Sequence, residues 1–180
     1  MEKVQSPARV ACVQMEVAQG EKTRNLDTAR RMILEGCEKG ANLLVLPELF
    51  NTGSMIEDRA EAYALAESIP NGTSVKMLLE LARTHGVYLV ASLLERQGPD
   101  LFNTAVLAGP EGLVGKYRKL HPCEDEVYWV EPGDLGLPVF HTQIGRIAML
   151  ICLDAYYPET ARICALQGAD IICIPSNWMD

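Results

Sequence analysis

The sequence has no apolar stretch long enough to cross a bilayer, which takes about 20 consecutive residues. Its longest apolar run, residues 144–153, is interrupted by Gly145 and Arg146. The first residues, 1–7, are polar and lack the apolar segment of a secretory signal. We therefore expect neither a membrane span nor a signal peptide, and we expect a cytoplasmic location.

Positive charge is scarce as well. The chain has 16 Lys and Arg against 24 Asp and Glu, a formal net charge of −8. Because an acidic surface repels phosphates, this balance argues against a nucleic-acid partner. Hydrophobic residues make up 48% of the 180 residues and charged residues 22%, so one ordinary globular domain with a sizeable core is expected.

The six cysteines contain no Cys-x-x-Cys pair, and the three histidines are scattered. Zinc ribbons and thioredoxin-like redox sites are therefore not indicated. Wide cysteine spacing without a secretory signal indicates reduced thiols. His121 and Cys123 could form half of a metal site, but a loop with an incidental cysteine is the interpretation that we prefer.

Apolar patterning predicts an α/β protein in which helices cover a sheet. Strands are predicted at 9–17, 43–46, 87–94, 102–108, 113–118, 144–151 and 170–174, and helices at 25–39, 57–67, 73–85 and 158–167. Thr73 or Ser74 is expected to cap the third helix and Gly86 to end it. Residues 121–136 are expected to form a long loop.

An acid, a cation and a thiol follow three of these strands. Glu48 lies just beyond the strand that ends at Leu46, while Lys119 and Cys152 stand at the ends of two later strands. Ligands of open α/β sheets gather at the carboxyl ends of strands, so the three side chains could converge at one rim.

This trio suits nucleophilic catalysis. A carboxylate can take the proton of a thiol, and an ammonium can hold the thiolate and stabilise an oxyanion, with the backbone N–H of Leu153 as a second donor. Taken singly, each residue has a plainer interpretation, namely a solvated acid, a surface lysine and a buried inert thiol. Cys123, in a loop near Lys119, competes for the role of nucleophile, and spacing leaves that choice open.

The local motifs resemble those of the nitrilase superfamily of carbon–nitrogen hydrolases. LPELF at 46–50 resembles its glutamate motif, KYRKLH at 116–121 its lysine motif, and ICLD at 151–154, followed by PE at 158–159, its cysteine motif. Segments 102–105, 131–134, 168–170 and 175–178 are similar too, so the resemblance extends over nearly the whole chain.

The resemblance implies roles for particular residues. Glu48 would be the general base, Lys119 the oxyanion stabiliser and Cys152 the acylated nucleophile. The second glutamate of the family matches Glu126 best, with Glu124 as the weaker match. The resemblance further implies an α-β-β-α sandwich, hydrolysis of a non-peptide C–N bond through a thioester, a homo-oligomer, and no metal or organic cofactor.

The chain also departs from the family pattern. Members are considerably longer, so we expect one carbon–nitrogen hydrolase domain over 1–180 that lacks its closing strands and C-terminal extension. Leu153 and Asp154 stand where nitrilases have Trp-Glu, which favours a small amide or N-carbamoyl substrate. Nitrile hydrolysis stays an alternative, because Lys119, Pro122 and Trp129 resemble the nitrilase loop. Two others are a non-catalytic subunit and a Cys–His hydrolase using His121.

Overall fold

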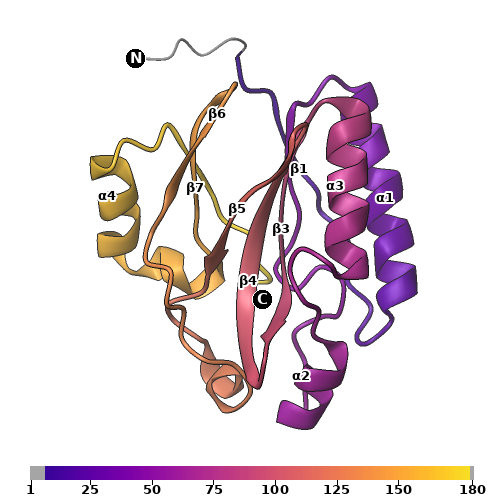
Figure 1. The fold of residues 1–180 in the computed structure, drawn as a ribbon, viewed down its shortest axis with the longest axis vertical. Helices are drawn as coiled ribbons and strands as arrows, with labels where there is room; N and C mark the ends of the chain where they lie inside the picture. Colours follow the sequence, from indigo (N-terminus) through magenta and orange to yellow (C-terminus); the bar gives the residue numbers. More distant parts are fainter. Residues whose placement is uncertain (1–6, 179–180) are drawn as a thin grey trace.

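Two β-sheets pack against each other in the computed structural model, which describes residues 7–178 (Figure 1). The larger sheet has the order β1-β2-β3-β4-β5, and the smaller one the order β6-β7-β8. The bounds in the larger sheet are Val10–Cys12, Leu43–Val45, Tyr88–Gln97, Asp100–Gly109 and Gly112–Arg118. Those in the smaller sheet are Val139–Thr142, Gly145–Met149 and Ile171–Cys173.

Helices form the two outer layers. Figure 1 shows α1 and α3 on the outer face of the larger sheet and α4 on that of the smaller sheet. The helices are α1 Lys22–Glu38, α2 Arg59–Leu65, α3 Thr73–His85 and α4 Pro158–Leu166, with 3-10 turns η1 Glu124–Tyr128 and η2 Cys152–Tyr156. The layers are therefore α-β-β-α, as the resemblance implies. No helix within the described residues is long and apolar enough to span a membrane.

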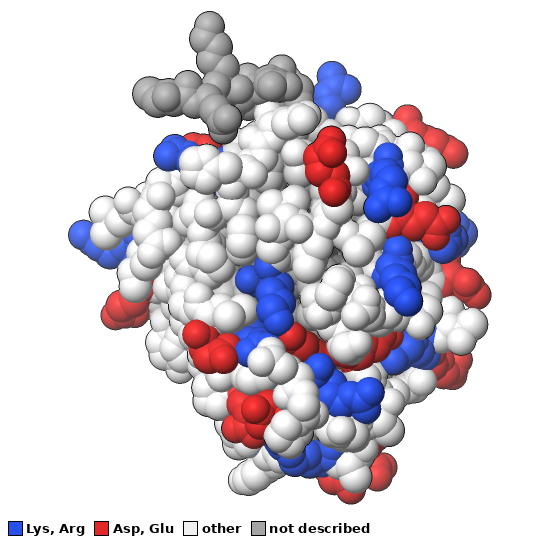
Figure 2. All heavy atoms as spheres, in the orientation of Figure 1, with Lys and Arg blue, Asp and Glu red and all other residues white. Residues whose placement is uncertain are grey.

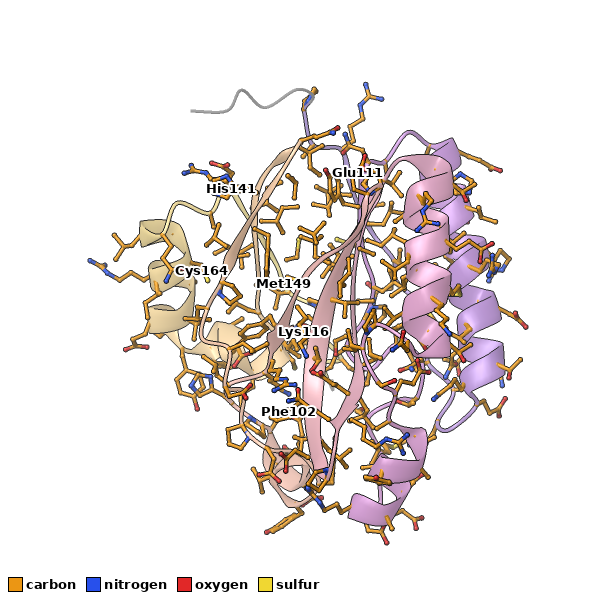
Figure 3. All side chains as sticks on the ribbon, in the orientation of Figure 1. Phe102, Glu111, Lys116, His141, Met149 and Cys164 are labelled. Carbon is orange, nitrogen blue, oxygen red and sulfur yellow. The ribbon has the colours of Figure 1, made fainter. Side chains whose placement is uncertain are left out.

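Strand alternation divides the core into two main layers. Leu44, Leu89 and Leu93 pack with α1 and α3, whereas Leu43 and Val90, one residue along, face the other sheet. Successive side chains of a strand point to opposite faces, so continuous apolar runs indicate strands that are covered on both sides. In Figure 3, Met149 lies between the sheets and Cys164 lies on the inner side of α4.

The structure corrects the boundaries of two predicted strands and adds one strand that was not predicted. The first strand is confined to Val10–Cys12 rather than 9–17, because its only neighbour in the sheet, β2, ends at Val45. The predicted strand at 144–151 is confined to Gly145–Met149, after a tight turn that connects it to β6. The sequence does not predict β6, because Val139–Thr142 is short, half-buried and only weakly apolar.

Two further predictions were wrong in detail. The loop predicted at 121–136 contains the turn η1. Neither Thr73 nor Ser74 caps α3, because Gly72 occupies the N-cap position. Instead the Glu67 carboxylate accepts hydrogen bonds from the Ser74 backbone N–H at 2.9 Å and its hydroxyl at 2.8 Å. Gly86 does end the helix, with φ at 65°. The prediction about residues 1–7 falls almost wholly outside the described residues.

Candidate active site

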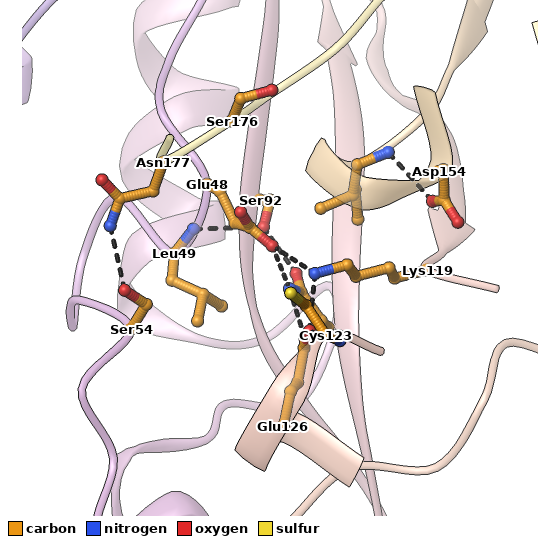
Figure 4. Close-up of polar contacts among 12 residues, drawn as sticks. Glu48, Leu49, Ser54, Ser92, Lys119, Cys123, Glu126, Asp154, Ser176 and Asn177 are labelled. Atoms are coloured by element: carbon orange, nitrogen blue, oxygen red, sulfur yellow. Dashed lines mark hydrogen bonds and ion pairs between the residues drawn. The ribbon is translucent and has the colours of Figure 1, made fainter. Parts of the chain in front are cut away.

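Four residues predicted as a site line one cavity of about 390 Å³. Glu48 follows β2, Lys119 follows β5, Cys152 begins η2 after β7, and Glu126 lies in η1. Both sheets and the loop between them therefore contribute to the cavity. Figure 4 shows the side chains of Glu48, Lys119 and Glu126 pointing toward one another.

Lys119 is held between two carboxylates in a nearly dry environment. Its Nζ lies 2.7 Å from Glu48 Oε1 and 2.5 Å from Glu126 Oε2. The side chains of Lys119, Glu48 and Glu126 are only 2%, 6% and 7% exposed. Removal of charges from water is costly unless they are paired, and this geometry supplies the pairing.

The neighbouring charges set the ionisation of this group. Burial disfavours the ammonium, but the charges of Glu48 and Glu126 outweigh it and raise the pKa of Lys119 above its usual value. Burial raises the pKa of Glu126, while Lys119 acts in the opposite direction. The lysine therefore stays cationic at any physiological pH, and it supplies a fixed positive charge inside the cavity.

Asn103 connects the two carboxylates through its side-chain amide. Its Nδ2 donates to Glu48 Oε1 at 2.9 Å and to Glu126 Oε1 at 2.7 Å. Its Oδ1 accepts a hydrogen bond from Ser92 Oγ at 2.6 Å, and the same hydroxyl accepts from Leu49 N. We did not single out Asn103 or Ser92 from the sequence. The available signal was an amide and a hydroxyl within apolar strands, where an unpaired polar group is costly.

Cys152 has a strained backbone. Its φ is 44°, and its N–H donates to Pro175 O at 3.0 Å. Leu49 and Glu124 share this left-handed conformation and are the other non-glycine residues within 7–178 that do so. All three line the same cavity. Such strain persists only where the surroundings enforce it, and it is typical of functional sites.

The thiol of Cys152 is protonated at rest. Burial, then the charge and hydrogen bonding of Glu48, raise its pKa to about 12. Such a thiol could act as a nucleophile only if a base removed its proton as the new bond formed, and Glu48 is the carboxylate adjoining it.

The competing residues occupy different environments. Cys123 lines the cavity, but it forms the N-cap of η1, where its N–H donates to Glu126 Oε2 at 2.8 Å. His121 pairs with Asp154 through Nδ1 at 2.7 Å and stacks on Tyr157, with 4.0 Å between ring centroids. Glu124 is exposed, whereas Glu126 is buried, so the stronger of the two glutamate matches has the site geometry.

The segment that follows β8 forms one wall of the cavity. There, Ser176 O accepts from Glu48 N at 3.3 Å and Asn177 Nδ2 donates to Ser54 Oγ at 2.9 Å. Leu153 is half-buried beside Cys152. Across residues 7–178, no three His, Cys, Asp or Glu side chains are arranged to hold a metal ion.

Residues 9–180 match the family model of carbon-nitrogen hydrolases. The chain belongs to the carbon–nitrogen hydrolase family. It is 44% identical to a nitrilase of Pyrococcus abyssi over 94% of this chain and 64% of that protein. It is 32% identical to an N-carbamoylputrescine amidase of Solanum lycopersicum over 84% of this chain and 53% of that protein. The chain thus spans less than two-thirds of the length of these relatives.

The fold comparison agrees with the family assignment. The crystal structure of an amidase from Nesterenkonia sp. superposes with a TM-score of 0.86 at 27% identity, covering 98% of this chain and 67% of that one. One solved variant of that amidase shows Michael addition of acrylamide at the active site cysteine. The resemblance to the nitrilase superfamily and the sandwich fold are therefore confirmed.

Proposed function

We propose that this chain carries the catalytic site of a thiol hydrolase that cleaves non-peptide C–N bonds in small amides or N-carbamoyl compounds. One observation carries the proposal: Cys152, Glu48, Lys119 and Glu126 line a single cavity, with the lysine between the two carboxylates. No metal or organic cofactor enters the mechanism. The domain assignment of 1–180, the homo-oligomer and the cytoplasmic location stay predictions.

Acylation begins with the protonated thiol. Glu48 takes the proton of Cys152 Sγ as the sulfur forms a bond to the carbonyl carbon. The negative charge that develops on the carbonyl oxygen is stabilised by Lys119 Nζ and the N–H of Leu153. Because Lys119 is already fixed by two carboxylates, it needs little reorganisation during the step.

The intermediate then collapses and releases the amine. The C–N bond breaks as Glu48 returns the proton to the leaving nitrogen, which leaves a thioester on Cys152. A water molecule gives a proton to Glu48 and attacks the thioester carbon, and the product acid leaves as the thiol is restored. Glu126 orients Lys119 throughout, through its bonds to Nζ and to Asn103.

The charge around the cavity favours some substrates over others. Glu57, Glu124 and Asp125 line it, are exposed, and have no ion-pair partner within the described residues. Lys119 is the one basic side chain of the lining, and Glu48 and Glu126 already neutralise it. We infer that an amide or carbamoyl compound with a cationic group is preferred over an anionic one by about tenfold or more. On the part of the surface seen in Figure 2, by contrast, both signs of charge are interspersed.

The first test is direct detection of the acyl-enzyme. The chain would be incubated with butanamide, 4-aminobutanamide, succinamate, matched N-carbamoyl compounds and butyronitrile, and then analysed by intact-protein and peptide mass spectrometry. We expect an adduct on Cys152, with 4-aminobutanamide reacting faster than succinamate. An adduct from the nitrile alone would instead support the nitrilase alternative.

Variants distinguish the remaining alternatives. Cys152→Ala should form no adduct, whereas Cys123→Ala should react normally. Glu48→Gln should lose acylation if Glu48 is the base, while retained acylation would support the Cys–His arrangement with His121. If the folded chain forms no adduct with any compound, either the C-terminal part of the longer relatives is required for activity or the chain is a non-catalytic subunit. The same assay on a longer form would distinguish these two alternatives.

A further inference from the structure

Asp154 is a fully buried carboxylate that makes four hydrogen bonds with three residues, and the proposed chemistry does not use it. Its Oδ2 accepts from the Tyr117 hydroxyl at 2.7 Å and from Ile151 N at 3.1 Å. Its Oδ1 accepts from His121 N at 3.0 Å and lies 2.7 Å from His121 Nδ1. Both oxygens are therefore engaged, each with two protein groups.

Asp154 and its partners lie close in sequence to Lys119 and Cys152. Tyr117 and His121 are two residues before and two residues after Lys119, while Ile151 precedes Cys152 and Asp154 follows it by two residues. Tyr117 belongs to β5 in the larger sheet, whereas Ile151 follows β7 in the smaller one. The carboxylate thus joins the two sheets beside the cavity, although Asp154 is not part of the lining. Figure 4 shows it beyond Lys119 on the side of η2.

We call these hydrogen bonds of the Asp154 carboxylate, which connect the two sheets, the Asp154 bridge. Its side-chain partners are held in a fixed protonation state or a fixed position. Burial, followed by the charge of Asp154, raises the pKa of Tyr117, so its hydroxyl stays protonated and donates. The His121 ring is fixed against Tyr157 by stacking at 4.0 Å. The backbone carbonyl of Asp154 also accepts from Thr160 Oγ1 at 2.7 Å, which fixes η2 to the start of α4.

We propose that Asp154 is a positioning residue that sets the distance and orientation of Cys152 relative to Lys119. This rests on the proposed function, because its consequence is expressed in the acylation step. The sulfur and the oxyanion donor come from different sheets, and a misplacement of 1 Å can cost about 100-fold in rate. The strained backbone at Cys152 also requires neighbours that enforce it, and the bond from Ile151 N lies one residue away.

Asp154→Asn tests the bridge with almost no change in shape. An amide has one oxygen, so its NH₂ group must face either Ile151 N–H with the Tyr117 hydroxyl, or the two His121 groups. The Tyr117 hydroxyl can rotate to accept, but a backbone N–H cannot, so one backbone donor loses its acceptor in either orientation. Asp170→Asn is the matched control, because Asp170 pairs with Arg146 in an exposed bridge at 2.9 Å.

The first measurement does not depend on activity. Native-state hydrogen exchange followed by mass spectrometry should show faster exchange in 117–121 and 150–154 together in Asp154→Asn, and in neither segment in Asp170→Asn. Unchanged exchange in either segment would overturn the proposal. The native chain could form no acyl-enzyme while Asp154→Asn still exchanges faster in both segments. In that case the proposed function fails, but the structural role of the bridge is supported.

The second measurement asks whether the bridge acts through Lys119. Single-turnover acylation should fall about 100-fold in Asp154→Asn, with KM changed less than about threefold. When Lys119 has already been replaced by Ala, adding Asp154→Asn should lower the acylation rate by less than about threefold, because there is no longer a lysine to position. Full multiplicative losses, or a lowered Tm with a normal rate, would indicate a merely structural role. If Asp154→Asn does not fold, Tyr117→Phe replaces it in both measurements, with about a tenfold loss expected.

Discussion

Replacement of Lys119 by methionine would leave two buried carboxylates without their shared cation. The methionine side chain is close in length and can occupy the same space, so packing changes little. Glu48 and Glu126 would keep only Asn103 as a common donor, at 2.9 and 2.7 Å. Loss of one partner from a buried ion pair typically costs about 3–5 kcal/mol, because the charge that stays behind is uncompensated. We expect a loss of that size at pH 8.

The loss should depend on pH in a definite direction. Burial already raises the pKa of Glu126, and Lys119 opposes this shift more strongly than the backbone N–H of Cys123 does. Without the lysine, the carboxyl pKa in the folded state moves further above that of the unfolded chain. A group shifted in this direction contributes stability at low pH and loses it as the pH rises through the folded-state pKa. The destabilisation should therefore be smaller at pH 5 than at pH 8, by at least about 1 kcal/mol.

Urea unfolding at the two pH values would measure both effects. Lys76→Met, on the exposed side of α3, is the control and should change the unfolding free energy by no more than about 0.5 kcal/mol. A loss below about 1 kcal/mol in Lys119→Met at pH 8, or an equal loss at both pH values, would refute the reasoning. Either result would mean that the carboxylates reach water or that the pairing contributes little to stability.

Three further changes test other parts of the molecule. In Glu95→Gln the buried Arg118 loses its buried carboxylate partner at 2.9 Å and keeps the exposed Asp134 at 2.8 Å, and we expect a loss of about 3 kcal/mol in urea unfolding. Burial opposes ionisation of Glu95, but hydrogen bonds from Arg118 and Lys116 hold its pKa below the usual value. The pair should thus stabilise the fold at pH values above the ordinary glutamate pKa, and this stabilisation should be lost as the pH falls through the lowered pKa of Glu95. A difference in unfolding free energy between the native chain and Glu95→Gln that does not change with pH would contradict this. Gly133→Ala would place a Cβ 2.1 Å from Arg118 O, so β5 must shift beside Lys119, with about 2 kcal/mol lost and a lowered Tm; an unchanged Tm would exclude this close approach. Cys123→Ala should leave acylation within about twofold by mass spectrometry, and loss of the adduct would reassign the nucleophile.

Regular elements with a strong apolar pattern could be read from the sequence, and weakly patterned ones could not. The four helices and the strands β2 to β5 are present close to where the apolar periodicity predicts them. β6 was missed because Val139–Thr142 gains its strand conformation by pairing with β7, a contact that local sequence does not encode. The length of β1 was overestimated for the related reason that β2 limits the ladder.

The sequence by itself determined the family and the candidate site residues: an acid, a cation and a thiol that each follow an apolar strand, within motifs shared with carbon–nitrogen hydrolases. Local sequence shows which side chains are reactive and where apolar strands end, and this is enough to select Glu48, Lys119 and Cys152 as candidates. Only the tertiary structure decided that Glu126 rather than Glu124 contacts the lysine, and that Asn103 links both carboxylates. The two Asn103 contacts join residues 23 and 55 positions apart, and distances over such separations are set by how the sheets pack. Asp154 shows the same division, because its identity is visible in the sequence while its four hydrogen bonds form only in the folded chain.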